Sequence, residues 1–290
     1  MNFEHGAHME SLHPGDYHKA AKPLEKVKLN TLFAKTVMEG HLPGTVLVDD
    51  ANKPKTFLVK HPYGMSLLIG DSSNTAFNKT LNEYMLDARG ERSGHEWLQV
   101  YPPDWKPMIE SLLGQHLIRK DTPQDQPATT PEVPGKVIEY SRVNYLFNPD
   151  LYKRFAGELK QPPYEVVRTT KAMFTDMPGQ VIPRYFWRDA EHFMKDSVGY
   201  TMVIDGRPAS TAFVAFAHGN QLEMGIETAV PYRGKGYAIY ACQALIDYCL
   251  SNGCEPIWSC RLENTSSFNL ARRLGFEPTL YTPYYQLVSH

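Results

Sequence analysis

The sequence has few of the features that mark membrane proteins or binders of polyanions. No apolar run reaches the roughly 18 residues that a membrane-spanning helix needs, and the N-terminus lacks the apolar core of a secretory signal. Thirty lysines and arginines nearly balance 32 acidic residues, so no net field favours nucleic acid or an anionic membrane. We therefore expect a cytoplasmic protein without a nucleic-acid or membrane partner.

Cysteine is also scarce, and its spacing argues against a metal site. The four cysteines are Cys242, Cys249, Cys254 and Cys260. They form no Cys-x-x-Cys pair and have no histidine pair at zinc spacing nearby, so we expect reduced, mostly packed thiols. A polar N-terminal stretch carries four histidines, which are His5, His8, His13 and His18. Without a structured ligand frame they predict a flexible tail and no metal.

The length indicates two domains. With 290 residues, of which 42% are hydrophobic and 21% charged, the chain has the composition of ordinary globular proteins. A proline-rich stretch, Asp121–Gly135, predicts an exposed loop. Three pairs of identical residues stand 161 positions apart, namely Trp97 and Trp258, Leu113 and Leu274, and Gly114 and Gly275. This echo favours a duplicated architecture, in which the strand Val137–Phe147 closes the first domain. The domains would be 1–148 and 149–290.

Hydrophobic periodicity predicts a mixed α/β (α+β) chain with mostly antiparallel strands. The helices are expected near 24–38, 74–88, 105–116, 149–159, 183–195, 236–250 and 266–274. The strands are expected near 44–49, 55–59, 65–69, 96–101, 137–147, 165–169, 200–204, 209–217, 221–229, 256–260 and 284–288. Asp205-Gly206 and Gly219-Asn220 supply the turn chemistry of a hairpin meander within the second half.

The strongest motif follows that meander. The strand 221–229 runs through Tyr232-Arg233-Gly234-Lys235-Gly236-Tyr237-Ala238 into a helix. Glycines let the backbone approach an anion closely, and the N-H groups and dipole of a first helical turn bind phosphate. The order of strand, glycine turn and helix therefore predicts a diphosphate site, against the alternative of a simple tight helix entry.

Two motifs together resemble the GNAT N-acetyltransferase superfamily. Arg233, Gly236 and Ala238 fit its Arg-x-x-Gly-x-Gly/Ala pattern, and the run from Asn264 to Phe276 is similar to its second coenzyme A element. The resemblance covers roughly 165–288, and its features extend to two-domain members such as glycine N-acyltransferases and zwittermicin-resistance acetyltransferases. It implies tandem GNAT-like domains with a degenerate N-terminal copy, in which Ser72, Ser73 and Thr75 stand where the glycine turn would be and Phe77 replaces the small Ala238.

The resemblance also implies which residues bind acetyl-CoA. Main chain at 228–230 would pair with the pantetheine amides, N-H groups at 233–238 would hold the diphosphate, and Asn264 would reach the pantetheine arm. The complete set that we assign to the cofactor is Thr228, Ala229, Val230, Arg233, Gly234, Lys235, Gly236, Tyr237, Ala238, Asn264 and Ser267.

For catalysis the sequence offers two acids on one strand. Alternation puts Glu223 and Glu227 on the same face, opposite Met224. The resemblance favours Glu223 as the base that accepts the amine proton, with Glu227 as the second choice. The alternative is a solvated strand face. A segment that resembles the acceptor-binding helices of the superfamily carries Arg184, Tyr185, Trp187 and Arg188, which would suit an acceptor with a carboxylate.

One position departs from the family pattern. Many GNAT enzymes have a tyrosine seven residues after the asparagine to protonate the leaving thiolate, and here that position is Ala271. The proton could come instead from one of five other phenols, which are Tyr232, Tyr237, Tyr281, Tyr284 and Tyr285. We therefore expect an N-acetyltransferase that acts on the primary amine of a small molecule. A non-catalytic acyl-CoA binding or sensing module, a scaffold for protein partners, and assembly as a homodimer stay open.

Overall fold

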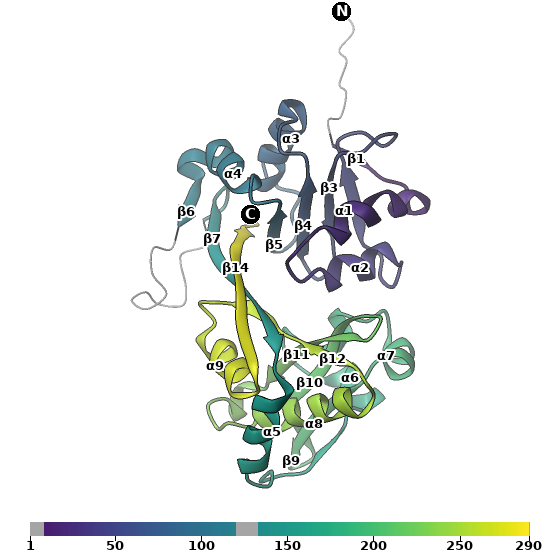
Figure 1. Cartoon of the computed structure of the whole chain (residues 1–290), viewed down its shortest axis with the longest axis vertical. Coiled ribbons are helices and arrows are strands. Elements are labelled where there is room, and N and C mark those ends of the chain that lie inside the picture. The colour runs from purple at the N-terminus through teal and green to yellow at the C-terminus, as the bar shows by residue number, and fades with distance from the viewer. Residues whose placement is uncertain (1–8, 120–132, 290) are drawn as a thin grey trace, which may run out of the picture. The chain divides into compact units, whose positions relative to one another are not determined.

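The computed structural model describes residues 9–119 and 133–289 of the chain (Figure 1). By packing, the chain divides into two compact units. The first unit comprises 1–142, 261–263 and 281–290, and the second unit comprises 143–260 and 264–280. The packing boundary thus lies at Arg142–Val143, and the end of the chain belongs to the first unit. His5, His8 and the prolines at 123, 127 and 131 lie outside the described residues.

The first unit holds the elements up to the start of β7. Its strands are β1 (Glu10–Ser11), β2 (Thr45–Val48), β3 (Thr56–Lys60), β4 (Met65–Gly70), β5 (Glu96–Tyr101), β6 (Leu117–Arg119) and β7 (Val137–Phe147). Its helices are α1 (Ala21–Glu25), α2 (Leu32–Met38), α3 (Thr75–Met85) and α4 (Trp105–Leu113), with 3-10 turns η1 (Pro14–Ala20) and η2 (Gly114–His116).

The second unit begins within β7 and repeats a similar series. Its helices are α5 (Pro149–Glu158), α6 (Lys171–Asp176), α7 (Ala190–Asp196), α8 (Ala238–Ser251) and α9 (Thr265–Arg273), with 3-10 turns η3 (Pro183–Tyr185) and η4 (Val230–Tyr232). Its strands are β8 (Val166–Arg168), β9 (Gly199–Ile204), β10 (Arg207–His218), β11 (Gln221–Thr228), β12 (Glu255–Ile257), β13 (Ser259–Arg261) and β14 (Phe276–Leu287).

The two units share one topology, as the repeated residues suggested. In the first unit β2, β3 and β4 pair antiparallel in sequence, and α3 then leads to β5, which pairs parallel with β4. In the second unit β9, β10 and β11 pair antiparallel, and α8 leads to β12, which pairs parallel with β11. The expected mixed α/β fold with mostly antiparallel strands and a duplicated core is confirmed.

The repeated residues occupy matching places in the two copies. Leu113 ends α4 and Leu274 follows α9, and both are buried. Each is followed by a glycine with positive φ, 48° at Gly114 and 86° at Gly275. A glycine is favoured there because the left-handed conformation that ends a helix strains any residue with a Cβ.

Three expected elements differ from the structure, each for a local reason. The helix expected at 24–38 is two helices, because the chain leaves the helical conformation at 26–31 and the Asn30 side chain accepts from the N-H of Leu32. The segment expected at 183–195 is η3 and α7, with Asp189 capping the N-H of His192 at 2.8 Å. The strand expected at 256–260 is interrupted at Trp258, where it changes partners.

The last strand is longer than expected and completes the sheet of the first unit. β14 starts at Phe276, and its end pairs antiparallel with β5, with Tyr285 opposite Leu98. The strand order β1-β2-β3-β4-β5-β14-β7-β13 puts β14 between β5 and β7. The closing strand expected from 137–147 is therefore present, but it is separated from β5 by residues from the other end of the chain.

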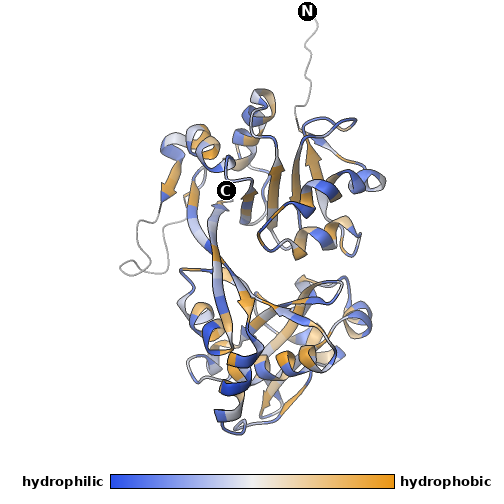
Figure 2. Ribbon diagram, viewed as in Figure 1, coloured by the Kyte–Doolittle hydropathy of each residue, from blue (hydrophilic) through white to orange (hydrophobic). Residues whose placement is uncertain are grey.

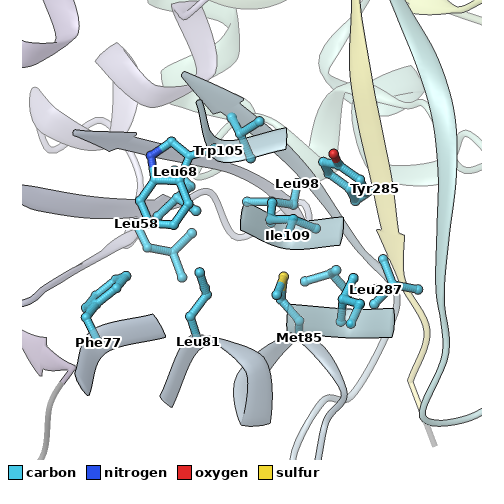
Figure 3. Packing of buried hydrophobic residues seen from close by; sticks show 13 residues of the cluster. Leu58, Leu68, Phe77, Leu81, Met85, Leu98, Trp105, Ile109, Tyr285 and Leu287 are labelled. Carbon is cyan, nitrogen blue, oxygen red and sulfur yellow. The ribbon is translucent and has the colours of Figure 1, made fainter. Parts of the chain in front are cut away.

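The core of the first unit depends on this strand. Figure 3 shows Tyr285 and Leu287 packed among side chains of β3, β4, β5, α3 and α4. Trp105 is fully buried there and donates its indole N-H to the carbonyl of Gly70 at 3.1 Å. In both units the apolar residues lie mostly on strands and on one side of the helices (Figure 2). Burying such faces is what stabilises a layered α/β fold.

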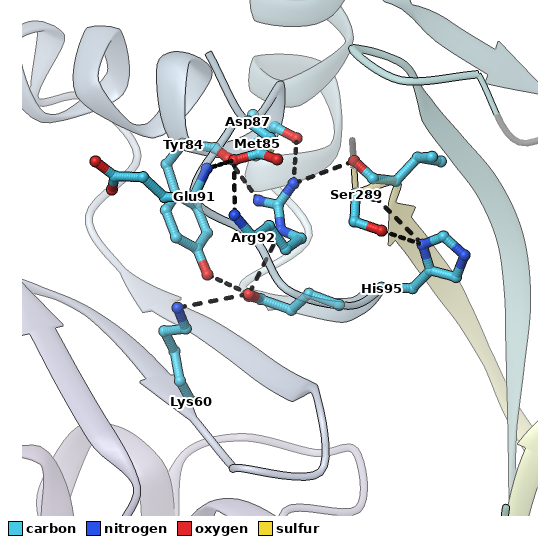
Figure 4. A network of polar contacts seen from close by, with 10 residues as sticks. Lys60, Tyr84, Met85, Asp87, Glu91, Arg92, His95 and Ser289 are labelled. Atoms are coloured by element: carbon cyan, nitrogen blue, oxygen red, sulfur yellow. Dashed lines mark hydrogen bonds and ion pairs between the residues drawn. The ribbon is translucent and has the colours of Figure 1, made fainter. Parts of the chain in front are cut away.

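A polar network also holds the end of the chain (Figure 4). Arg92 donates to the carbonyls of Tyr84 and Val288, at 2.6 and 3.4 Å. Tyr84 donates to the buried carboxylate of Glu96. The N-H of Ser289 lies 3.3 Å from Nδ1 of His95. These bonds connect the segment between α3 and β5 to the residues that follow β14.

Within the described residues, no helix combines the length and apolarity that crossing a membrane requires.

Candidate active site

The candidate site lies where two parallel strands of the second unit separate. β12 pairs with β11 only from Gln221↔Glu255 to Glu223↔Ile257. β11 continues to Thr228 with β10 as its ladder partner, whereas the chain after Ile257 leaves the ladder. The edge of residues 224–228 is therefore outside the β11–β12 ladder. Such an edge can accept an extended amide-bearing ligand as if it were a strand.

Glu223 lies at the last pair before the strands separate. It is 4% exposed, and Ser259 donates its hydroxyl to Oε1 at 2.9 Å. The partner strand β10 has an irregular register between Val214 and Phe216, opposite Met224 and Glu223. Bulges of this kind re-aim side chains beside functional sites. The alternative of a solvated face is wrong for Glu223, because its side chain is buried.

Glu227 points to the same side of β11 but has different partners. Its Oε2 accepts the N-H groups of Gln180 and Val181 at 3.0 and 2.8 Å. Its Oε1 accepts from Arg233 Nη2 at 3.0 Å, and the Glu227 side chain is only 9% exposed. The carboxylate thus binds the backbone of residues 180–181 and the side chain of Arg233 instead of facing solvent.

The glycine turn presents an open backbone to the start of α8. Gly234 and Gly236 have φ of 75° and 76°, and a Cβ at either position would meet nothing within 4 Å. Among the described residues, no side chain caps the N-terminus of α8. Its first N-H groups and its dipole are therefore available to an anion. Arg233 differs from the other turn residues, because its N-H donates to Val230 at 3.3 Å and its Nε to Thr228 at 2.8 Å.

The second motif forms the start of α9. Asn264 caps this helix by accepting the N-H of Ser267 at 3.2 Å. The Ser267 hydroxyl in turn accepts the indole N-H of Trp258 at 3.2 Å, and Trp258 is buried as expected. These bonds fix Asn264 and Ser267 at the start of the helix that follows β13. Thr228 lies on β11, and its hydroxyl is 2.8 Å from that of Ser210.

Ala271 is fully buried on α9, so a small packed side chain stands where many family members have the tyrosine. Of the five phenols considered for its role, Tyr284 and Tyr285 belong to the first unit and are buried there. Tyr232 and Tyr237 flank the glycine turn, and Tyr281 is 53% exposed. Partial desolvation and a hydrogen bond with Tyr164 raise the pKa of Tyr237 above its ordinary value.

The segment 184–188 is mainly structural. Arg184 donates to the carbonyls of Thr175 and Met177. Trp187 is buried and donates its indole N-H to Val214 at 2.7 Å. Of the four residues expected to line an acceptor site, Tyr185 and Arg188 remain exposed. We therefore find little of the aromatic and cationic lining that the segment suggested.

The cysteines are free thiols, as expected, and Cys242, Cys249 and Cys260 are buried. Burial raises the pKa of Cys249 to about 12, so this thiol stays protonated and unreactive. Cys260 Sγ lies 3.3 Å from the hydroxyl of Tyr145. No group of three or more metal-ligating side chains occurs within 9–119 and 133–289.

Sequence reasoning missed the partners that place the two glutamates. Ser259 is an ordinary strand residue in the sequence, and only the strand separation brings it to Glu223. The N-H groups that bind Glu227 come from residues 46 and 47 positions earlier in the chain. Backbone donors leave no trace in residue identity, so no sequence signal could have revealed them.

The corresponding place in the first unit is closed. β4 and β5 pair from Met65↔Trp97 to Ile69↔Tyr101, over almost the full length of both strands. The side chain of Asn74 caps α3 by accepting the N-H of Phe77 at 3.1 Å. Phe77 itself is fully buried. The first copy thus has the topology of the second copy without its open edge or its uncapped helix.

Comparison with known proteins identifies the family of the chain. The family model described as GNAT acetyltransferase matches residues 22–285. The protein named uncharacterized N-acetyltransferase YdfB, from Bacillus subtilis (strain 168), is 24% identical over 257 residues, which are 87% of this chain and 89% of that protein.

Two solved structures have similar folds. A GCN5-related N-acetyltransferase-like protein from Streptococcus suis 89/1591 has a TM-score of 0.68 at 18% identity, covering 94% of this chain and 98% of that one. A tandem GNAT protein from the clavulanic acid biosynthesis pathway has a TM-score of 0.57 at 11% identity, covering 97% and 98%.

The chain belongs to the GNAT acetyltransferase family, since the family model spans most of its length. It is an acetyltransferase whose two units share one topology. Enzymes of this family use acetyl-CoA as the acetyl donor.

Proposed function

We propose that this protein transfers the acetyl group of acetyl-CoA to a primary amine of a small molecule, at a site within the second unit. The observation that carries the proposal is the separation of β11 from β12 at Glu223, beside an uncapped helix with an open glycine turn. An edge for amides, a cradle for a diphosphate and a buried carboxylate thus follow one another along a single strand and its turn.

The residues present fit coenzyme A. In our proposal the main chain of Thr228, Ala229 and Val230 pairs with the pantetheine amides. The N-H groups of the turn and of the first turn of α8 would hold the diphosphate, from Gly234, Lys235, Gly236, Tyr237 and Ala238. Asn264 and Ser267 would border the pantetheine arm from the start of α9. Arg233 would act differently, by anchoring the turn through Thr228 and Glu227.

Acetyl-CoA, when bound, supplies an acetyl group activated as a thioester. The task of the protein is then to hold a neutral amine beside it and to take the amine proton. We assign the proton to the carboxylate of Glu223, which the Ser259 hydroxyl holds in place at the point of strand separation. Ala271 cannot return a proton to the thiolate, so Tyr232 or Tyr237, beside the glycine turn, is the proposed source.

The test of this function is release of coenzyme A thiol from acetyl-CoA by purified protein with a panel of amino acids, polyamines and amine-bearing antibiotics. We expect turnover with at least one class. Coenzyme A binding without turnover by any amine would favour the sensing module instead, for which Ala271 is the supporting observation. If calorimetry detected no binding of coenzyme A, the proposed site would be rejected. The remaining alternative would be a scaffold for protein partners.

A substitution in the turn tests where the cofactor binds. Gly236→Asp puts a carboxylate against the diphosphate, so we expect at least a roughly tenfold loss of coenzyme A affinity in calorimetry. Gly253→Asp is the matched control, because Gly253 also has positive φ (67°) and open surroundings, but at the other end of α8. Equal affinities in the two variants would contradict the assignment of the turn.

A second substitution tests the proposed base. Glu223→Gln keeps the shape of the side chain and an acceptor for Ser259, but it cannot take a proton at neutral pH. We expect kcat to fall by roughly 10²- to 10⁴-fold with little change in coenzyme A affinity. Steady-state kinetics on the best amine of the panel would measure this. A variant with wild-type kcat would show that another group accepts the proton.

A further inference from the structure

A loop of the second unit is attached to β11 through one carboxylate. The loop 177–182 joins α6 to η3, and no regular ladder holds its backbone. The N-H groups of Gln180 and Val181 both donate to Oε2 of Glu227. Hydrogen bonds from N-H groups to an ionised carboxylate are among the stronger ones in proteins.

The close approach at this contact depends on a glycine. Gly179 has φ of 139°, and a Cβ there would lie 2.7 Å from Cγ of Glu227. At the other side of the loop, Arg184 donates to the carbonyls of Thr175 and Met177. The loop is therefore held by two charged side chains: Glu227 accepts from two of its N-H groups, and Arg184 donates to the carbonyl of Met177.

The same carboxylate also reaches the glycine turn. Its second oxygen, Oε1, accepts from Nη2 of Arg233 at 3.0 Å, and Nε of Arg233 donates to the carbonyl of Thr228 at 2.8 Å. Arg233 directly precedes Gly234 in the proposed diphosphate cradle. A continuous set of hydrogen bonds thus runs from the loop through Glu227 to the turn. We call residues 177–182, Glu227 and Arg233 the loop clamp.

We propose that Glu227 is a positioning residue that couples the loop to the glycine turn, so that coenzyme A bound at the turn rigidifies the loop. The inference rests on the proposed function of the turn. A general base needs a lone pair directed at the substrate, whereas both oxygens of Glu227 already accept from the protein. A ligand that restricts the motion of the turn also restricts Arg233. Because Arg233 is hydrogen-bonded to Glu227, and Glu227 to the loop, the motion of the loop is restricted as well.

The loop lies on the side of β11 that carries both glutamates, because Glu227 reaches it directly and alternation puts Glu223 on the same face. This is the face on which an amine would meet the proposed base. Coupling would therefore order the acceptor side when the acetyl donor is in place. In this enzyme the donor should raise the affinity for the amine, and the amine should raise that for the donor by the same factor.

The test is amide hydrogen exchange of the full chain with and without coenzyme A, in the wild type and in two variants. Glu227→Ala removes both connections of the loop clamp. Arg233→Met leaves the loop bonds to Glu227 intact but removes the connection to the turn. Glu223→Gln is the control, since it keeps a side chain of the same size on the same face outside the clamp.

In the wild type we expect coenzyme A to slow exchange at Gln180 and Val181. In Glu227→Ala these amides should exchange fast with or without ligand, and coenzyme A should bind about tenfold more weakly because Arg233 is released. In Arg233→Met the amides should stay protected, but coenzyme A should no longer change their exchange. In Glu223→Gln, the exchange of these two amides and its response to coenzyme A should match the wild type, although kcat falls.

Kinetics separate positioning from proton transfer. For the best amine of the panel, Glu227→Ala should raise KM for the amine about tenfold while the acidic limb of the pH profile of kcat stays in place. Loss of the acidic limb in Glu227→Ala would overturn the inference. Exchange rates of the loop amides that change neither with coenzyme A nor in the variants would also overturn it. If the wild type bound no coenzyme A, the proposed function would fail instead, whatever Glu227→Ala does to the loop.

Discussion

At the scale of single residues, His61 has the clearest electrostatic signature. It is 3% exposed at the end of β3, and its Nδ1 accepts the N-H of Tyr63 at 3.1 Å. Burial lowers the pKa of His61 from 6.5 to about 4. The folded state therefore disfavours the charged imidazolium, which would also lose the bond from Tyr63.

The lowered pKa makes the stability of the protein depend on pH. Between about pH 6.5 and pH 4 the unfolded chain binds a proton that the folded chain does not, so stability is full above this window and falls as pH drops through it. Over the whole window the loss amounts to about 3 kcal/mol. His61→Asn keeps an acceptor for Tyr63 but does not titrate.

We therefore expect wild type to lose more stability than His61→Asn when urea denaturation is compared at about pH 7.5 and about pH 4.5, by about 2 kcal/mol or more. Other acids titrate in both proteins, so the difference between the two curves isolates His61. Parallel curves would mean that folding does not lower the pKa of His61.

Residue identity and alternation predicted which acids share a face of β11, but not how each is used. Glu223 and Glu227 look equivalent in the sequence. Their roles divide because Ser259 contacts one and backbone N-H groups of residues 180 and 181 contact the other. Such partners arise from tertiary packing, which local pattern does not encode.

At the scale of elements, β14 contributes more to the first unit than its place in the sequence suggests. Tyr285 is fully buried in the core of that unit, and Leu287 pairs with Glu96 of β5. The prediction began only at 284, whereas the strand starts at Phe276 and contains Pro278 and Pro283. A strand can include proline where its N-H is not needed in the ladder.

Tyr285→Ala should therefore destabilise the half of the protein that is distant from it in sequence. We expect a loss of about 3 to 5 kcal/mol, as for other large aromatic truncations in a core, with faster amide exchange in α3 and β5. Tyr281→Ala is the matched control, because this ring on the same strand is 53% exposed, and its change should stay within about 0.5 kcal/mol. Similar losses in both variants would contradict the packing.

The glycine turn is the element that the sequence predicted best. The order of strand, turn and helix follows from spacing alone, and α8 begins at Ala238, within two residues of the expected start. The resemblance implied that strands splay beyond Val230, but the separation of β11 from β12 already begins after Glu223. Its place could not be predicted, because it depends on β13 taking a different neighbour in the strand order. Local propensity describes a strand but not its partner.

At the scale of the whole molecule, the two units share one topology but differ at one place in their structure. In the first unit the parallel strands β4 and β5 are paired almost throughout and α3 has a side-chain cap, whereas the second unit lacks both features at the same place. The echo of 161 residues predicted the repeat, and the serines near α3 suggested its loss of function. The pairing that closes the first copy was not visible in the sequence.

This asymmetry predicts the stoichiometry of binding. Isothermal titration should give one coenzyme A per chain, and amide exchange should slow in β11 and α8 but not in β4 and α3. Two equivalent sites per chain, or protection in the first unit equal to that in the second, would contradict the distinction between the copies.

The shared strand also has a consequence for synthesis. Domains usually fold in the order in which they leave the ribosome. Here residues 284–287 occupy a central position in a sheet whose other strands were made more than 130 residues earlier, apart from β13. The N-terminal unit must therefore wait, incomplete and with an exposed strand edge, until residues 284–287 have been synthesised, and chaperones that shield such edges should matter most for its yield.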